Sequence, residues 1–269
     1  MTRKVTFLGI AAMAAIAVAS SAAAQSLYGT QQPNSQTASK GMAALQQAAD
    51  TNRYLFVFFY SDGKDANTRA MSEVFDAAMT RMADRADGIT LHVMDPAEKP
   101  IVDKFSARGA PMPLVLAIAP TGAATRAFPK KFEEVQLQQG FVSPCAAMCM
   151  KAIQDRHLLL ICVQNHNTQF NDEALQGVQT FKADPQYDKV TDVVLLNPDN
   201  QAEQSFLKAL QVNPRTTKAI TLLVTPPGAP VGSFEGPVTK EEIVAKLAAA
   251  QSSGCPGGKC GPGGCGPKK

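Results

Sequence analysis

Short continuous apolar runs, rather than alternating ones, stand out along the chain. Residues 55–60 read Leu-Phe-Val-Phe-Phe-Tyr, and residues 158–163 read Leu-Leu-Leu-Ile-Cys-Val. Runs of this length without a polar position are typical of strands that are buried on both faces. We therefore expect each run to form a strand covered by other elements on its two sides.

Two further pairs of runs repeat this pattern. Residues 91–96 find a counterpart 102 residues later in residues 193–198, including an Asp-Pro or Asn-Pro end. Residues 114–122 correspond, 106 residues later, to residues 220–228, and both enter a turn that contains proline and glycine. Matched runs at a nearly constant spacing predict an internal duplication.

Helical patterns lie between the predicted strands. Apolar residues recur at i, i+3 and i+4 spacing after the first strand of each unit, which predicts amphipathic helices. Ser143 and Pro144 begin the closing helix of the first unit, which ends near Gln154, and Thr239 forms a capping box with Glu242 at the closing helix of the second. Alternating strands and helices favour an α/β fold, with mainly parallel pairing and helices on both faces of each sheet.

The two ends of the chain differ from the duplicated region. Residues 1–24 combine a basic start, an apolar run of about 14 residues and a small-residue cleavage site, the pattern of an export signal and shorter than the roughly 20 residues of a membrane span. Residues 25–38, rich in Gln, Ser and Thr, predict a disordered lead-in, and residues 252–269, dominated by Cys, Gly, Pro and Lys, cannot form an apolar core. The units between them are predicted at residues 39–154 and 155–251.

Composition narrows the function classes. Hydrophobic residues make up 45% and charged residues 18% of the chain, which is enough apolar material for a packed core. The formal net charge is +3, and Arg3 and Lys4 leave with the signal, so a nucleic-acid partner is not indicated. No second apolar run is long enough to cross a membrane. We expect a periplasmic or extracellular protein, in a compartment where cysteines pair.

The element order, with Phe59 and Tyr60 before a turn and Pro113 just before the third strand, resembles the thioredoxin-like superfamily. The tandem arrangement resembles the repeated domains of protein disulfide isomerases. In that family a Cys-x-x-Cys motif follows the Phe-Tyr strand, whereas Lys64 and Asn67 stand at those positions here. The resemblance implies that Pro113 is the cis-proline beside the substrate groove. On the residues alone, Pro113 is equally a strand-edge proline, since only about 5–6% of X-Pro bonds are cis.

The second unit departs further from the family pattern. His166 and Gln169 occupy the places of the two cysteines, and Ala219 stands where the first unit has Pro113. Dithiol exchange needs a thiolate that attacks a disulfide and a second cysteine that resolves the product. These side chains supply neither sulfur. The sequence therefore favours a protein without the family's redox activity.

Three cysteines fall inside the predicted units. Cys162 lies in an apolar run and is interpreted as a core residue. Cys145 and Cys149 lie one turn apart near a helix start, where the helix dipole favours thiolates. Their Cβ atoms, about 5–6 Å apart at i, i+4 spacing, are too distant for an unstrained disulfide, which needs about 3.5–4.5 Å. Inward packing, metal ligation and pairing with the tail all remain open for them.

Cys255, Cys260 and Cys265 repeat every five residues in the tail. Copper(I) suits an all-sulfur site, and zinc(II) suits four thiolates, so these are the two metals that the cysteines would hold together with Cys145 and Cys149. The spacing is not that of a zinc ribbon. Three thiols at even spacing favour binding or bridging, and the alternative is a flexible basic tail with incidental or intermolecular disulfides.

Three functions compete. The leading hypothesis is an exported, non-enzymatic thioredoxin-like binding or scaffold protein that presents grooves and a thiol-rich tail to a protein partner. The first alternative is capture or handover of copper or zinc by the tail cysteines. The second is an atypical thiol-disulfide oxidoreductase that uses Cys145 and Cys149 or pairs of tail cysteines.

Overall fold

The computed structural model describes residues 39–252. The predicted signal (1–24), the predicted lead-in (25–38) and the tail cysteines Cys255, Cys260 and Cys265 lie outside the described residues. Within the described range, no helix is both long and apolar enough to cross a bilayer.

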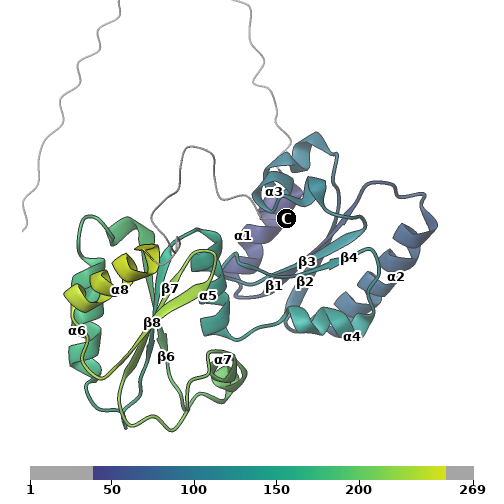
Figure 1. The fold of residues 1–269 in the computed structure, drawn as a ribbon. Coiled ribbons are helices and arrows are strands. Elements are labelled where there is room, and N and C mark those ends of the chain that lie inside the picture. The colour runs from purple at the N-terminus through teal and green to yellow at the C-terminus, as the bar shows by residue number, and fades with distance from the viewer. Residues whose placement is uncertain (1–38, 253–269) are drawn as a thin grey trace, which may run out of the picture. The chain divides into compact units, whose positions relative to one another are not determined.

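A four-stranded mixed sheet with strand order β2-β1-β3-β4 forms the first half (Figure 1). β1 pairs in parallel with β2 and antiparallel with β3, and β3 pairs antiparallel with β4. The elements are α1 (Lys40–Asp50), β1 (Tyr54–Tyr60), α2 (Ala66–Arg81), β2 (Ala86–His92), α3 (Lys99–Lys104), β3 (Leu114–Ile118), β4 (Ala124–Pro129) and α4 (Glu134–Leu137), with short 3-10 helices η1 (Pro96–Glu98), η2 (Ala107–Gly109) and η3 (Gln138–Gly140).

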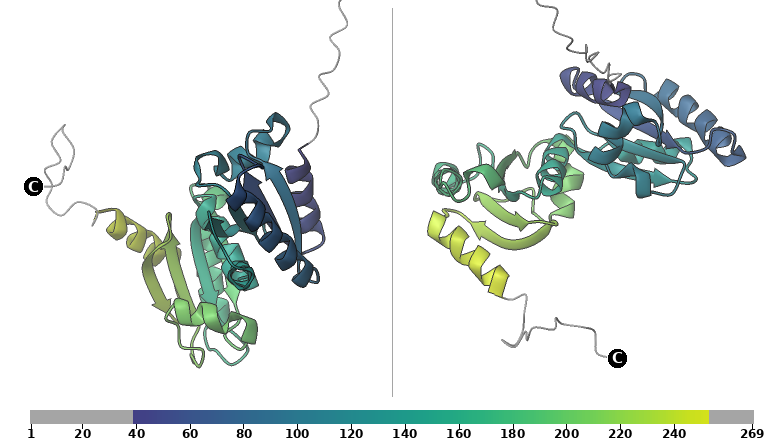
Figure 2. Two further views of the ribbon diagram at one scale, coloured as in Figure 1. Left: turned by 90° about the vertical axis from the view of Figure 1, so that its right-hand side faces the viewer. Right: turned by 90° about the horizontal axis from the view of Figure 1, so that it is seen from above.

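The second half repeats this sheet with strand order β6-β5-β7-β8 and the same senses of pairing. Its elements are α5 (Pro144–Gln154), β5 (Leu158–Val163), α6 (Asn171–Lys182), η4 (Asp188–Val190), β6 (Thr191–Leu196), η5 (Gln201–Glu203), α7 (Gln204–Ala209), β7 (Ile220–Thr225), β8 (Ala229–Glu235) and α8 (Lys240–Ser252). The predicted fold class, two α/β units that each carry a mixed sheet flanked by helices, is confirmed (Figure 2). The expectation of mainly parallel pairing is wrong, because each sheet has one parallel and two antiparallel strand pairs.

The continuous apolar runs are explained by burial on both faces. In β1, Leu55, Val57 and Phe59 pack with α1 and α3, while Phe56 and Phe58 pack with α2 and α4. β5 alternates in the same way between a cluster with α5 and α7 and a cluster with α6 and α8. Because both faces are covered, the buried interior positions of both strands carry no charged side chain.

The helix that begins at Pro144 belongs to the second sheet, not to the first as the sequence analysis expected. Cys149 and Ala152 of α5 pack in one cluster with Leu159 and Ile161 of β5. α5 therefore takes the place that α1 has in the first half, and α4 is the last helix of that half. The cap at Ser143 marks a helix start but carries no information about which sheet the helix covers. We propose to place the boundary before α5, which gives a first unit of residues 39–142 and a second of residues 143–252.

Strand register also corrects one predicted correspondence. Phe59 pairs with Leu91 in the first sheet, and Val163 pairs with Leu196 in the second. Asp95 thus corresponds to Asn200, and not to the Asn that precedes Pro198. Both side chains begin a 3-10 helix by accepting a main-chain N–H two residues on, at 2.9 Å and 3.0 Å. The apolar run before Pro198 looks alike in sequence but is shifted along the sheet.

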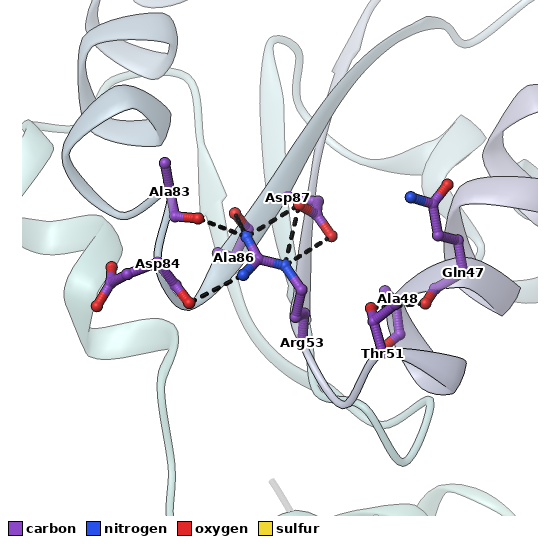
Figure 3. A network of polar contacts seen from close by, with 8 residues as sticks. All are labelled: Gln47, Ala48, Thr51, Arg53, Ala83, Asp84, Ala86 and Asp87. Carbon is purple, nitrogen blue, oxygen red and sulfur yellow. Dashed lines mark hydrogen bonds and ion pairs between the residues drawn. The ribbon is translucent and has the colours of Figure 1, made fainter.

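A guanidinium fixes the turn between α2 and β2 of the first unit (Figure 3). Arg53 Nε donates to both carboxylate oxygens of Asp87 at 3.1 Å, and its terminal nitrogens donate to the carbonyls of Ala83, Asp84 and Ala86 at 2.6–2.9 Å. At the same place in the second unit, the His157 imidazole pairs with the Asp192 carboxylate, with Nδ1 and Oδ2 2.9 Å apart.

The first unit ends in a two-way hydrogen bond. The Tyr54 hydroxyl, at the start of β1, donates to the Val142 carbonyl at 2.9 Å and accepts from the Val142 N–H at 3.0 Å. The ring of Phe141 packs edge-on against Tyr54. The chain that leaves the first unit is therefore held to the beginning of its central strand.

Candidate functional site

The loop between β1 and α2 holds the two positions where the family's cysteines would lie. Asp62 Oδ1 accepts the Lys64 N–H at 2.8 Å, and Asp65 caps α2 by accepting the Thr68 N–H at 2.7 Å. This hydrogen bond from Thr68 lowers the pKa of Asp65. The Lys64 side chain is exposed. The turn is therefore an ordinary capped helix start with a cation on its surface.

Asn67 connects this helix start to the end of β4. Its Nδ2 donates to the Lys130 carbonyl at 3.0 Å, and the Lys130 N–H donates to the Pro113 carbonyl at 2.7 Å. The Met112–Pro113 peptide bond is cis. Lys64 and Asn67 are thus separated in role: Lys64 faces solvent, while Asn67 helps to position the segment around Pro113.

A cavity of about 720 Å³ opens beside these residues. It is lined by Ser61, Asp62, Asp65, Asn67, Thr68, Met112, Pro129, Lys130 and Lys131. The main-chain N–H and C=O of Met112 make no hydrogen bond with any other residue of the described range. One residue of the cavity lining therefore has a main-chain donor and a main-chain acceptor that are unpaired within the described range.

The second unit closes the corresponding place with its own chain. Gln169 bridges to the segment before β7: its N–H donates to the Thr217 carbonyl, and its carbonyl accepts the Ala219 N–H, both at 2.9 Å. The Lys218 main chain is bonded to the Thr216 hydroxyl. Because the strands correspond at Phe59 and Val163, Gln169 lies one residue before the N-cap of α6, and not at the place of Asn67 as predicted.

The fold is thioredoxin-like. Two sheets of this strand order, a helix that starts directly after the central strand, and a cis-proline before β3 of the first unit support the recognition made from sequence.

Solved structures with this fold are similar to the chain. Thioredoxin O2 from Arabidopsis thaliana is 15% identical, with a TM-score of 0.30, over 36% of this chain and 80% of that one. The first two thioredoxin domains of Saccharomyces cerevisiae Eps1p are 8% identical, with a TM-score of 0.28, over 77% and 94%. Human ERp44 is 10% identical, with a TM-score of 0.33, over 78% and 55%. No protein-family profile and no curated protein sequence matches the chain. At these identities the likeness concerns the fold alone.

The three cysteines of the described range do not line the cavity beside Pro113. Cys145 is half-buried, while Cys149 and Cys162 are buried, and all three are free thiols in the second unit. Burial raises the pKa of Cys145 and of Cys149 to about 12, and the Glu203 carboxylate adds to both shifts. The expectation that the helix dipole favours thiolates at these positions is therefore wrong, because burial beside an anion outweighs the dipole.

A buried carboxylate at each first helix is a feature that the sequence analysis missed. Glu98, 3% exposed, accepts from the Ser39 hydroxyl at 2.7 Å and from the N–H groups of Lys40 and Gly41 at 2.9 Å. Glu203, 1% exposed, accepts from the N–H of a single residue of the described range, Cys145, at 3.0 Å.

The difference between the two carboxylates has a chemical cause. Pro144 stands where the first unit has Lys40, and proline has no N–H to donate. Glu203 Oε2 consequently has no hydrogen-bond partner within residues 39–252. The repeated Asp95-Pro-Ala-Glu and Asn200-Gln-Ala-Glu segments were the available signal for this pair of sites.

The described residues do not assemble a metal centre. In the range 39–252, no group of three or more His, Cys, Asp or Glu side chains is arranged to hold a metal ion. The copper or zinc hypothesis therefore rests on Cys255, Cys260 and Cys265, which lie outside that range.

Proposed function

We propose that this protein is an exported, non-enzymatic binding protein whose first thioredoxin-like unit holds an extended segment of a partner polypeptide. The observation that carries the proposal is the unpaired N–H and C=O of Met112 on the wall of the cavity beside Pro113. An extended peptide satisfies such a pair through its own main chain, which is the hydrogen-bonding pattern of strand addition. Export rests on the signal pattern of residues 1–24.

The chemistry of the site supports binding rather than exchange. No cysteine of residues 39–252 lines the cavity, and Lys64 and Asn67 occupy the positions of the redox pair. The thiols of Cys145 and Cys149, with pKa values of about 12, carry almost no thiolate near neutral pH. Attack on a disulfide requires the thiolate, so dithiol exchange is disfavoured at Lys64 and Asn67 and at Cys145 and Cys149, and the hypothesis of an oxidoreductase then depends on the tail cysteines.

The charges of the cavity suggest how a partner is selected. Asp62 and Asp65 lie on one part of the lining, and Lys130 and Lys131 lie on another, so the formal charges cancel. A peptide is therefore held chiefly by main-chain pairing and shape, and a strongly acidic or strongly basic segment gains little overall. We infer a partner segment of mixed or neutral composition.

Amide hydrogen exchange of the full-length mature chain tests the proposal. A ten-residue peptide of neutral composition, selected from a random library on the intact protein, is added, and exchange is followed residue by residue. We expect the Met112 amide to exchange fast without peptide and at least tenfold more slowly with it. The Ala219 amide, already bonded to Gln169, should not change. Protection at Ala219 without protection at Met112 would contradict the proposal.

Two variants separate main-chain from side-chain binding. Met112→Ala keeps the N–H donor and should bind the peptide within about threefold of the original. Met112→Pro removes the donor and should weaken binding at least tenfold, with circular dichroism as the check on folding. Equal affinity of two folded variants would show that the main chain of Met112 does not bind the peptide. If the proline variant does not fold, the exchange measurement on the unaltered chain decides.

A further inference from the structure

One face of the second sheet is left partly uncovered. α5 and α7 lie over it, yet a cavity of about 610 Å³ remains between them and β7 and β8. Five apolar side chains around it are only half-buried, namely Ile153, Phe206, Leu210, Ile220 and Leu222. Its floor consists of buried side chains, including Cys149, Leu159 and Ile161.

The first unit shows that this exposure is not inherent in the fold. By strand register, Ile220 and Leu222 correspond to Leu114 and Leu116, which are 5% and 7% exposed. There, Phe105 and Met112 pack against the cluster that contains both leucines. The same sheet positions are thus closed in one unit and open in the other. An open apolar face of this kind usually marks a binding surface.

The lining defines the chemistry of an occupant. None of the side chains that line the cavity is charged, and the thiol of Cys149, with its raised pKa, is neutral as well. Side-chain hydrogen-bonding groups are confined to Gln211, Asn213 and Ser233, which are exposed and therefore lie at the mouth. Burying an ion among such groups is costly, so the cavity selects against charge. Its volume lies within the range of about 300–1,000 Å³ found for small-molecule sites.

We propose that this cavity of the second unit binds an uncharged aliphatic molecule, with the hydrocarbon chain against Leu159, Ile161 and Leu222 and a polar end group at Asn213 and Ser233. This site is separate from the cavity lined by Met112, which lies in the first unit. An apolar side chain of a partner protein is the competing occupant, and the test below distinguishes the two.

Fluorescence titration of the full-length mature chain with N-phenyl-1-naphthylamine, an uncharged apolar probe, tests the site. We expect one probe per chain, displaced by 1-decanol. Decanoate and decylammonium, which differ from the alcohol in carrying a charge, should compete at least tenfold more weakly. The absence of probe binding, or equal competition by all three compounds, would overturn the proposal. Displacement by apolar peptides but not by 1-decanol would assign the surface to a protein partner instead.

Variants locate the probe. Ala209 is an exposed residue that lines the cavity at the end of α7, so Ala209→Trp should fill the space and weaken probe binding at least tenfold. Val190→Trp adds the same ring at an exposed position away from the cavity and should leave binding unchanged. Leu222→Lys is a second cavity variant. It places a cation in the cavity, so the affinity for decanoate should rise relative to that for 1-decanol. If neither cavity variant changes the titration, the probe binds elsewhere and the proposal fails.

Discussion

The two units share one frame and differ in which polar groups they leave without a partner. In the first, Glu98 is saturated by three donors, whereas the Met112 main chain is unpaired. In the second, Glu203 keeps a bare oxygen, whereas Gln169 pairs with the corresponding main-chain segment. Buried polar groups normally find partners. The comparison therefore teaches that the two units differ in local hydrogen bonding at equivalent positions while the strand order stays the same.

The same contrast holds for apolar surface. The face of the first sheet that packs with α1 and α3 is closed over Leu114 and Leu116, while the equivalent face of the second sheet leaves Ile220 and Leu222 half-exposed. Each unit has thus kept one surface available and sealed the other. The first unit offers hydrogen bonds at a groove, and the second offers a neutral apolar cavity.

The largest expected effect concerns the thiols beside Glu203. With pKa values of about 12 instead of 9.0, Cys145 and Cys149 should react with iodoacetamide about a thousandfold more slowly at pH 8 in the folded chain than after unfolding. The folded-state rate should keep rising tenfold per pH unit beyond pH 10. Mass spectrometry of alkylated peptides measures both. A plateau near pH 9 would show that neither burial nor Glu203 controls the thiols.

These thiols also give stability a pH dependence of known sign. Because the folded-state pKa is raised, the neutral thiols contribute fully below about pH 9. Their contribution is lost as the pH rises from 9 towards 12.

Glu203→Gln removes the anion and should lower the pKa of Cys145, so its alkylation at pH 8 should become faster. An unchanged rate in the Gln variant would leave burial as the only cause.

Exchanging each buried carboxylate for an amide should separate the two units next. In Glu98→Gln, the amide NH₂ must face an N–H or hydroxyl donor, so we expect a loss of about 2–4 kcal/mol in the free energy of unfolding. In Glu203→Gln, the NH₂ takes the place of the unpartnered Oε2, so the loss should stay below about 1 kcal/mol. Amide hydrogen exchange at increasing urea concentration measures the free energy of unfolding of each unit separately. Equal losses would contradict the difference in hydrogen bonding.

A smaller effect on stability is expected from changing Arg53 or His157, which occupy equivalent positions directly before β1 and β5. Arg53→Lys keeps the charge but cannot reach Asp87 and three carbonyls together, so the Tm of the first unit should fall by several degrees. His157→Gln loses a single contact to Asp192 and should shift the Tm of the second unit less. Calorimetry of the two variants compares them. A larger Tm shift for His157→Gln than for Arg53→Lys would contradict the expectation that the Arg53 contacts stabilise their unit more.

The smallest effect on stability should come from restoring the main-chain N–H that Pro144 lacks. Pro144→Ala supplies an N–H that, by analogy with Lys40, reaches Glu203 Oε2. The gain of about 0.5–1.5 kcal/mol from a typical intramolecular hydrogen bond is reduced by about 0.4–1 kcal/mol, because alanine frees the unfolded chain. We expect net stabilisation of the second unit by less than about 1 kcal/mol in urea titration. Destabilisation would mean that the fixed proline dihedral matters more than the donor.

The sequence predicted the strands better than their assembly. The unbroken apolar runs at β1 and β5 identified strands covered on both faces, because that burial excludes polar residues at every position. α5 was recognised from its Ser143 cap but assigned to the wrong sheet. The sequence comparison matched Asp95 to Asn197 instead of Asn200. Apolar residues and an Asx-Pro pair occur at both Asp95 and Asn197, and only the hydrogen-bond register of the strands shows that Asn200 is the equivalent residue.

The candidate groove was only partly predictable. Lys64, Asn67 and Pro113 could be placed from the resemblance, because they follow recognisable strand and turn patterns. The unpaired main chain of Met112 could not, since it depends on which segments fail to reach it. Glu98 was missed for the same reason: its partners lie 57–59 residues away in the chain, and a single glutamate has no local signature of burial.

The Tyr54 hydroxyl, bonded in both directions to Val142, sets an order of completion. All strands of the first sheet, and the carboxylate that anchors α1, precede Val142 in the chain. Every one of these parts is therefore encoded before the first turn of α5. The first unit thus contains within residues 39–142 every contact that closes its sheet and its groove, and it needs no strand of the second sheet to complete them.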